Sequence, residues 1–252
     1  NALIRIYSRM VSCSFIVLAV MSYFLFVDIK CGIVQTCFIA FYLFLFSTYQ
    51  SRASVGRVFY AFAMLGLASI YYVQILYFVP VIWVLMATNI MNGCARIYVA
   101  SLLGLLVPYW FAAGYYAFTD QLSLFDDHFA ALLCLDSQSV WLDVPLAQIL
   151  TIAFVALLAI VGMINFRLNN YRDKIRTRML FDFFSVMIVF TLIFMVFQPT
   201  NMHFLLAILI VSASPLIGHF ISLTNSLVTN LVFCLMLVAT LVLTFCNVWI
   251  RF

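Results

Sequence analysis

Apolar segments of about twenty residues follow one another along the whole chain, separated by short polar stretches. A helix needs roughly twenty apolar residues to cross a bilayer, so each segment predicts a membrane-spanning helix. We expect about nine such spans, with these bounds: 10–27, 31–48, 58–73, 75–92, 98–118, 144–166, 181–198, 204–222 and 227–249.

The third and fourth spans are drawn from one run, residues 58–91, that has no charged break. As a single helix this run would be about 50 Å long at 1.5 Å per residue, whereas the apolar core of a bilayer is about 30 Å thick. We therefore expect the chain to turn near residues 72–74 or at Pro80 and to cross twice.

The composition supports a membrane protein and excludes a soluble one. Hydrophobic residues make up 67% of the chain and charged residues 8%, whereas a soluble domain carries about a quarter charged residues. The predicted fold is an all-α polytopic bundle, a single transmembrane domain over residues 1–252.

The cations orient the chain. With the N-terminus in the cytoplasm, the inner segments hold ten Lys and Arg residues and the outer segments hold two, Lys30 and Arg251. This is the bias of the positive-inside rule. Because that rule explains the basic residues, the net charge of +4 does not indicate nucleic-acid binding.

Residues 167–180 form the most basic inner segment. Plotted at 100° per residue, its cations do not share one face, so a basic amphipathic helix is not predicted. Orientation accounts for most of this charge, and a contact with anionic lipid or a protein partner is a further candidate role. The residues concerned are Arg167, Arg172, Lys174, Arg176 and Arg178.

Residues 119–143 form an outer acidic loop with five aspartates and no Lys or Arg. Within it, Leu122, Phe125, Phe129 and Leu132 recur at helical spacing. The pattern is typical of a short amphipathic helix on the membrane surface. An ordinary loop with apolar anchors is the alternative.

A polar cavity is one candidate site within the spans. His219 follows Ser214 and Pro215 in the eighth span, and Pro108 interrupts the fifth. Proline breaks the backbone ladder, and two kinked spans can enclose a cavity. The alternative is a neutral His219 bonded to a neighbouring helix.

Four outer residues form a second candidate site: Asp28, Asp126, Asp127 and His128. Multi-pass lipid-linked glycosyltransferases use an acidic residue in their first external loop, the place of Asp28 here. Asp126, Asp127 and His128 point about 100° apart on a helix, so a solvated face is the alternative to a site. For Asp28 the alternative is an interfacial ion pair with Lys30.

Small residues four apart predict two close helix contacts. They are Ala100 with Gly104 and Ser214 with Gly218. Such pairs let two membrane helices approach closely.

The run ARIYVASLLGLLVPYWFAAGYYAF, residues 95–118, and the later SPLIGHFISLTNS resemble a family of multi-pass inner-membrane proteins from Bacteroidota. Its Gly-x-x-x-Pro-Tyr-aromatic element is matched by Gly104, Pro108, Tyr109 and Trp110. The resemblance implies a bacterial inner membrane; the family has no assigned activity, so it carries over no functional residues.

No enzyme, metal or cofactor motif occurs in the sequence. We therefore expect a non-catalytic subunit of an envelope-biogenesis or export complex, with membrane lipids and proteins of the same membrane as partners. A transporter or flippase for a lipid-linked or amphipathic substrate is the alternative, and a multi-pass glycosyltransferase is the third.

Overall fold

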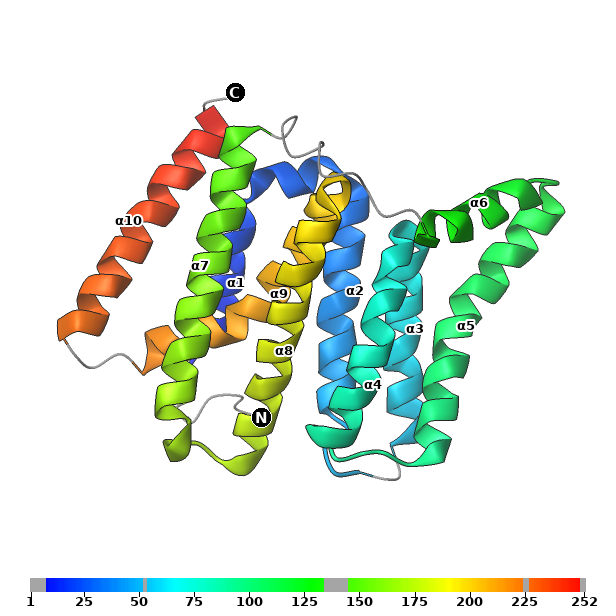
Figure 1. Cartoon of the computed structure of the whole chain (residues 1–252), viewed down its shortest axis with the longest axis horizontal. Helices are drawn as coiled ribbons and strands as arrows, with labels where there is room; N and C mark the ends of the chain where they lie inside the picture. The colour runs from blue at the N-terminus through cyan, green and yellow to red at the C-terminus, as the bar shows by residue number, and fades with distance from the viewer. Residues whose placement is uncertain (1–7, 52–53, 134–144, 224–226, 250–252) are drawn as a thin grey trace. The chain divides into compact units, whose positions relative to one another are not determined.

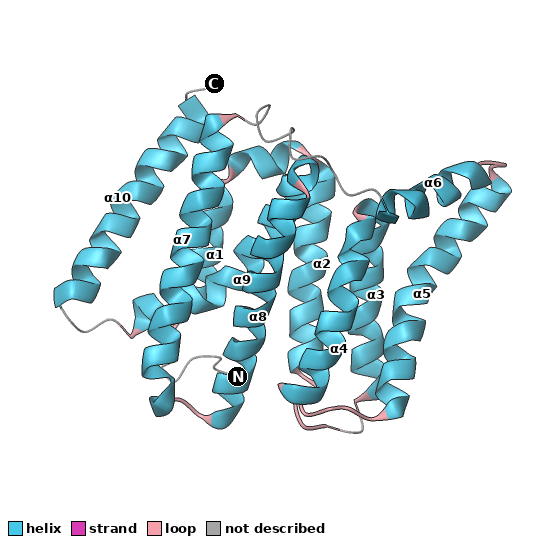
Figure 2. Ribbon diagram, viewed as in Figure 1, coloured by secondary structure: helices cyan, strands magenta, loops and turns pink. Residues whose placement is uncertain are grey.

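The computed structural model describes residues 8–51, 54–133, 145–223 and 227–249. In these residues the structure consists of helices joined by turns and loops and contains no strand (Figure 2). The chain divides into two compact units, one formed by Asn1–Cys31 with Asp136–Phe252 and the other by Gly32–Leu135. We call them unit 1 and unit 2.

Unit 1 is built around helix α9, which is buried at every residue from 205 to 220. Helices α1, α7 and α8 pack against α9, and α10 lies against α1 and α7 (Figure 1). Two short 3₁₀ turns, η1 (Tyr23–Val27) and η5 (Pro199–Asn201), follow α1 and α8. The helices are α1 (Met10–Met21), α7 (Leu146–Asn169), α8 (Ile175–Phe197), α9 (Met202–Ser222) and α10 (Leu227–Trp249).

Glycines let the backbone of α9 pack directly against the backbones of α1 and α7. A Cβ on Gly218 would lie 2.8 Å from the backbone of Val11 in α1, and one on Gly162 of α7 would lie 3.1 Å from the backbone of Leu216. The hydroxyl of Ser14 also donates to the carbonyl of Ser214, 2.8 Å away. The small-residue pair at 214 and 218 therefore lies at a close helix contact, as its spacing predicts.

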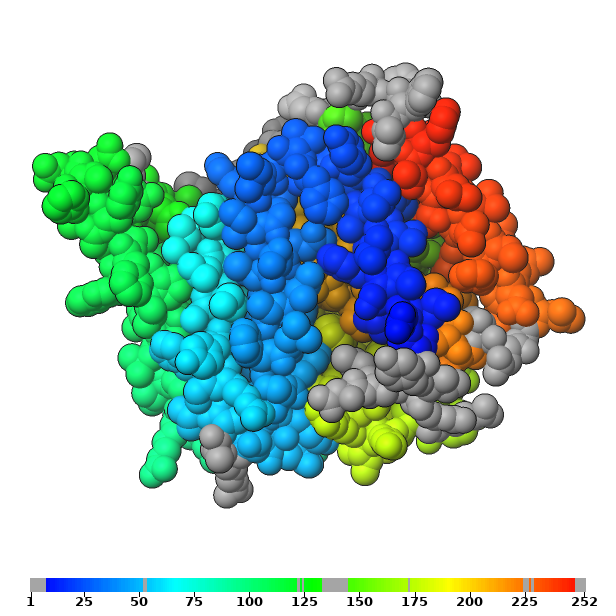
Figure 3. All heavy atoms as spheres, turned by 180° about the vertical axis from the view of Figure 1, so that it is seen from behind, coloured from blue at the N-terminus to red at the C-terminus, as the bar shows by residue number. Residues whose placement is uncertain are grey.

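Helix α10 is attached to the rest of unit 1 mainly at its C-terminal end. The side-chain amide of Asn247 donates to the carbonyl of Met21 at 2.8 Å and to the hydroxyl of Thr151 at 2.9 Å. Most of its apolar side chains are exposed, among them Leu231, Leu235 and Leu241. Figure 3 shows α1 and α10 on the same face of unit 1.

Unit 2 contains α2 (Ile29–Phe46) from Gly32 onward, then α3 (Val55–Tyr71), α4 (Phe78–Thr88), α5 (Ala95–Phe118) and α6 (Leu122–Leu133). Helices α3 and α5 are the most closely packed pair. A Cβ on Gly66 of α3 would lie 2.8 Å from the carbonyl oxygen of Leu105, and one on Gly104 would meet the carbonyl of Phe59.

The turn expected between the third and fourth spans is present. Helix α3 ends at Tyr71, Tyr72 is extended, and the 3₁₀ turn η2 (Val73–Tyr77) leads into α4. Pro80 lies in the first turn of α4, where a missing backbone N–H costs no intrahelical bond.

Six helices of the described residues are long and apolar enough to cross a membrane: α2, α5, α7, α8, α9 (from Pro199) and α10. Three further apolar stretches, Met10–Met21, Val55–Tyr71 and Val73–Thr88, are shorter. The chain is therefore a helical protein with the architecture of a multi-pass membrane protein.

Candidate functional site

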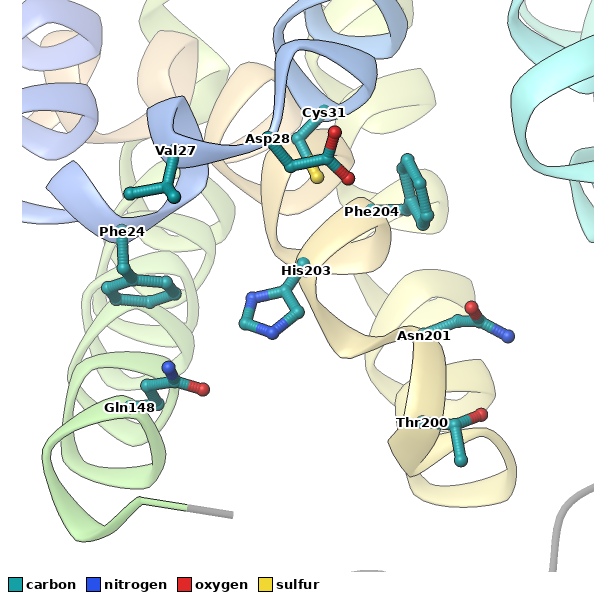
Figure 4. Close-up of a pocket in the computed structure, with 9 residues that line it drawn as sticks. All are labelled: Phe24, Val27, Asp28, Cys31, Gln148, Thr200, Asn201, His203 and Phe204. Atoms are coloured by element: carbon teal, nitrogen blue, oxygen red, sulfur yellow. The ribbon is translucent and has the colours of Figure 1, made fainter.

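A cavity of about 350 Å³ lies at one end of unit 1 (Figure 4). Its walls come from the segment that joins α1 to α2, the first turn of α7 and the turn between α8 and α9. The lining residues are Phe24, Val27, Asp28, Cys31, Gln148, Thr200, Asn201, His203 and Phe204.

Asp28 reaches the cavity because the chain changes direction there. The 3₁₀ turn η1 (Tyr23–Val27) ends at Asp28, whose backbone is extended, and α2 begins at the next residue. Oδ1 of Asp28 accepts the backbone N–H of Lys30 at 3.0 Å. This bond satisfies one of the N–H groups that the start of a helix leaves without a partner.

His203 forms the other side of the cavity from the first turn of α9. The 3₁₀ turn η5 (Pro199–Asn201) precedes this helix and brings Thr200 and Asn201 to the same wall. The imidazole lies edge-on to the ring of Phe24, with 5.7 Å between ring centroids. Aromatic rings prefer this arrangement because the positive edge of one faces the negative face of the other.

A second polar feature lies near the opposite end of α9. Nε2 of His219 is 2.9 Å from Oδ2 of Asp173, and the two side chains are 0% and 1% exposed. Asp173 has extended backbone between the 3₁₀ turn η4 (Asn170–Arg172) and α8. The pair therefore fastens the α7–α8 connection to α9.

Aromatic rings enclose this pair. The imidazole of His219 lies 5.0 Å from the ring centroid of Phe181 and 5.4 Å from that of Phe166. Nδ1 of His219 and Oδ1 of Asp173 are buried and have no hydrogen-bond partner among the residues that the structure describes. A polar pair in such surroundings depends on its one shared hydrogen bond, because water cannot replace it.

The residues predicted for a polar cavity do not line the cavity of unit 1. Ser214, Pro215 and His219 are buried within α9, which continues past Pro215 as one helix. Pro108 lies in α5, which belongs to unit 2. Of the two alternatives for His219, the structure has the bonded histidine, with Asp173 as its partner.

The predicted outer acidic residues belong to different units. Asp28 lies in unit 1, whereas Asp126, Asp127 and His128 lie on α6 in unit 2. Both aspartates on α6 are exposed. Residues 134–144, which complete the predicted acidic loop, lie outside the described residues.

Helix α6 packs its aromatic side chains on α5. Phe129 lies 5.3 Å from the ring of Tyr109, and Phe125 contacts Tyr116. The carbonyl of Leu132 accepts the hydroxyl of Tyr77 at 2.8 Å, which fastens the C-terminal end of α6 to η2. The structure thus places a helix where the sequence pattern predicts one.

The imidazole of His128 on α6 is partly buried beside Tyr109 of α5. This burial lowers the pKa of His128 from its ordinary value of about 6.5. A lowered pKa favours the neutral imidazole in the folded state, so the stability of the α6 contact should fall as the pH drops through 6.5. The protection factors of the amides in residues 122–133, which are corrected for the base-catalysed rise of intrinsic exchange with pH, should be lower at pH 5.5 than at pH 7.5. The substitution His128→Gln should abolish this difference; an equal pH effect in that variant would contradict the assignment.

The cations of residues 167–180, which are predicted to lie on the inner side, are mostly exposed. The guanidinium of Arg167 lies 3.5 Å from the carboxylate of Asp182, and Lys174 and Arg176 are exposed near the start of α8. Arg178 is half-buried, and the side chain of Arg172 lies outside the described residues. These positions allow a contact with lipid head groups or a partner without showing one.

Sequence reasoning missed Asp173 and every polar residue of the cavity lining except Asp28, His203 among them. Asp173 stands among the cations of residues 167–180 and was indistinguishable from a solvated countercharge. His203 falls one residue before the predicted eighth span. A histidine at a span boundary with an acidic residue at another boundary on the same side would have indicated the cavity.

Among the described residues, no group of three His, Cys, Asp or Glu side chains is arranged to hold a metal ion. The cavity of unit 1 thus combines one carboxylate, one imidazole, two amides and a hydroxyl with apolar walls. Such a lining can bind a small polar group next to an apolar one. No protein-family model, curated protein or solved structure matches the chain.

Proposed function

We propose that this chain crosses a bacterial inner membrane nine times and binds an amphipathic substrate as a transporter or flippase. The cavity of unit 1 is the observation that carries the proposal. Its volume of about 350 Å³ lies at the lower end of the range for small-molecule pockets, about 300–1,000 Å³. The cavity therefore suits a head group and not a whole lipid.

If the N-terminus is in the cytoplasm, this cavity lies near the outer surface of the membrane. Asp28 then follows the first span on the outer side, Gln148 lies near the outer end of the sixth span, and His203 immediately precedes the eighth. All three elements of the lining thus come from helix ends on one side. A reporter fused after Lys174 should remain cytoplasmic; finding it outside would contradict this orientation.

An amphipathic substrate fits this position because the cavity has an apolar rim. Val27 is 76% exposed at its edge, and exposed apolar side chains continue along η1 and α1 at Tyr23, Val20 and Ile16. A head group in the cavity would leave its acyl chain beside these residues and within the bilayer. The polar head group of the substrate would therefore enter the protein, while its acyl chain stays in the hydrocarbon core of the bilayer.

Native mass spectrometry of the protein purified in mild detergent tests this function. The wild-type chain should retain bound lipid, and Gln148→Trp, which fills the cavity from α7, should lose most of it. Leu146→Trp is the matched control, because Leu146 is 71% exposed on the same helical turn and does not line the cavity. Equal lipid retention in all three proteins would contradict the proposal.

A second candidate function is a non-catalytic subunit of an envelope-biogenesis or export complex. The exposure of α10 along most of its length favours it, since such a helix can pack against a helix of another protein. Stable, stoichiometric proteins in the same purification would support this function. A monomer that retains lipid in the cavity would support the first one.

A further inference from the structure

We infer that the head group held in the cavity of unit 1 carries a primary ammonium group. This inference rests on the proposed function, because it assigns the chemistry of the substrate at that site. It follows from the charge of the lining, from its aromatic rings and from its hydrogen-bond acceptors.

Of the described residues that line the cavity, Asp28 is the only Asp, Lys or Arg. Within the described residues it forms no ion pair with a Lys or Arg side chain. Its Oδ1 accepts the N–H of Lys30, and a carboxylate has acceptor capacity on both oxygens. A cation in the cavity would therefore be attracted by this carboxylate, whereas a phosphate there would be repelled.

The apolar part of the lining also favours a cation. The rings of Phe24 and Phe204 line the cavity, and the imidazole of His203 lies edge-on to Phe24. A cation within about 6 Å of an aromatic face is attracted by the negative charge of that face. The carboxylate of Asp28 and the aromatic rings thus both favour a positively charged ligand.

The neutral polar residues can accept the donors of such a group. An ammonium has three N–H donors and no acceptor. Besides Asp28, the residues Gln148, Asn201 and Thr200 line the same cavity (Figure 4), and each carries an oxygen that can accept a hydrogen bond. These acceptors distinguish a primary ammonium, which donates three hydrogen bonds, from a quaternary one, which donates none.

The test uses the whole chain in nanodiscs that contain equal parts of phosphatidylethanolamine and phosphatidylglycerol. Native mass spectrometry after release into detergent then identifies the lipid that stays bound. The wild-type protein should retain the ethanolamine lipid about fivefold over the glycerol lipid, a ratio in keeping with one charge-assisted contact at a partly exposed site. Preference for the glycerol lipid, or equal retention, would overturn the inference.

Asp28→Asn is the decisive variant. Asparagine has the same size and also caps helix starts well, so α2 should begin unchanged. This variant should retain the two lipids about equally. Soluble ethanolamine at saturating concentration separates two sources of the ammonium: displacement of the lipid indicates a free amine as substrate, and no displacement indicates an amine-bearing lipid.

The outcomes distinguish this inference from the proposed function. If Gln148→Trp retains as much lipid as wild type, the cavity does not hold the substrate and both fail. If Gln148→Trp loses lipid but Asp28→Asn keeps the wild-type preference, only the ammonium inference fails. Retention of a sugar-bearing lipid in place of the ethanolamine lipid, in nanodiscs that contain both, also overturns it.

Discussion

Replacing Asp173 with alanine should lower the free energy of unfolding by about 2–4 kcal/mol, because it leaves a buried polar group without a partner. His219 is fully buried, and Asp173 is the partner of its Nε2 at 2.9 Å. The rings of Phe166 and Phe181 lie against the imidazole, so its other neighbours there are apolar. Unfolding of the purified protein in detergent, followed by circular dichroism, measures this loss.

Two variants serve as controls for that experiment. Asp173→Asn keeps an acceptor oxygen near His219 and should lose less stability than Asp173→Ala. Asp182→Ala removes a carboxylate 3.5 Å from Arg167, whose side chain is 60% exposed, and should cost less than about 1 kcal/mol. If Asp173→Ala is no less stable than Asp182→Ala, the buried pair does not fasten the α7–α8 connection.

Substituting Gly104 with alanine should destabilise unit 2 by about 2 kcal/mol, since overpacking a close contact typically costs 1–3 kcal/mol. The added Cβ would meet the carbonyl of Phe59 in α3 and approach the backbone N of Ala63 to 3.2 Å. Both obstacles are backbone atoms, so α3 and α5 would have to separate. Gly66, which faces Leu105 across the same interface, should respond in the same direction.

Gly114 provides the matched control because it lies in the same helix and would have no atom within 4 Å of an added Cβ. Alanine is a better helix former than glycine by about 0.8–1.0 kcal/mol. Gly114→Ala should therefore leave stability unchanged or raise it, while Gly104→Ala lowers it. Equal effects of the two substitutions in thermal unfolding would contradict the close contact.

Local features of the fold could be predicted from the sequence because they depend on residues close in the chain. The turn at Tyr72 follows from the excessive length of residues 58–91 as one helix. The contacts at Gly104 and Gly218 follow from small residues four apart. The helix from Leu122 follows from apolar residues at helical spacing.

The candidate sites depend on contacts between distant parts of the chain, which periodicity does not reveal. His219 and Asp173 are 46 residues apart. In the sequence Asp173 lies among cations, where an acidic residue is expected to be solvated. Asp28 and His203 line one cavity because α1 and α9 pack closely together, with Gly218 of α9 against the backbone of Val11 in α1. The division into two units likewise reflects helix packing and leaves no mark in composition.

A structure of the protein in lipid nanodiscs by electron cryo-microscopy would show whether the cavity of unit 1 holds a substrate. We expect density for a lipid head group between Asp28, Gln148 and His203, with an acyl chain that continues past Val27 along α1. Density for lipids elsewhere around the helices, with side chains closing the cavity, would contradict a substrate site in unit 1.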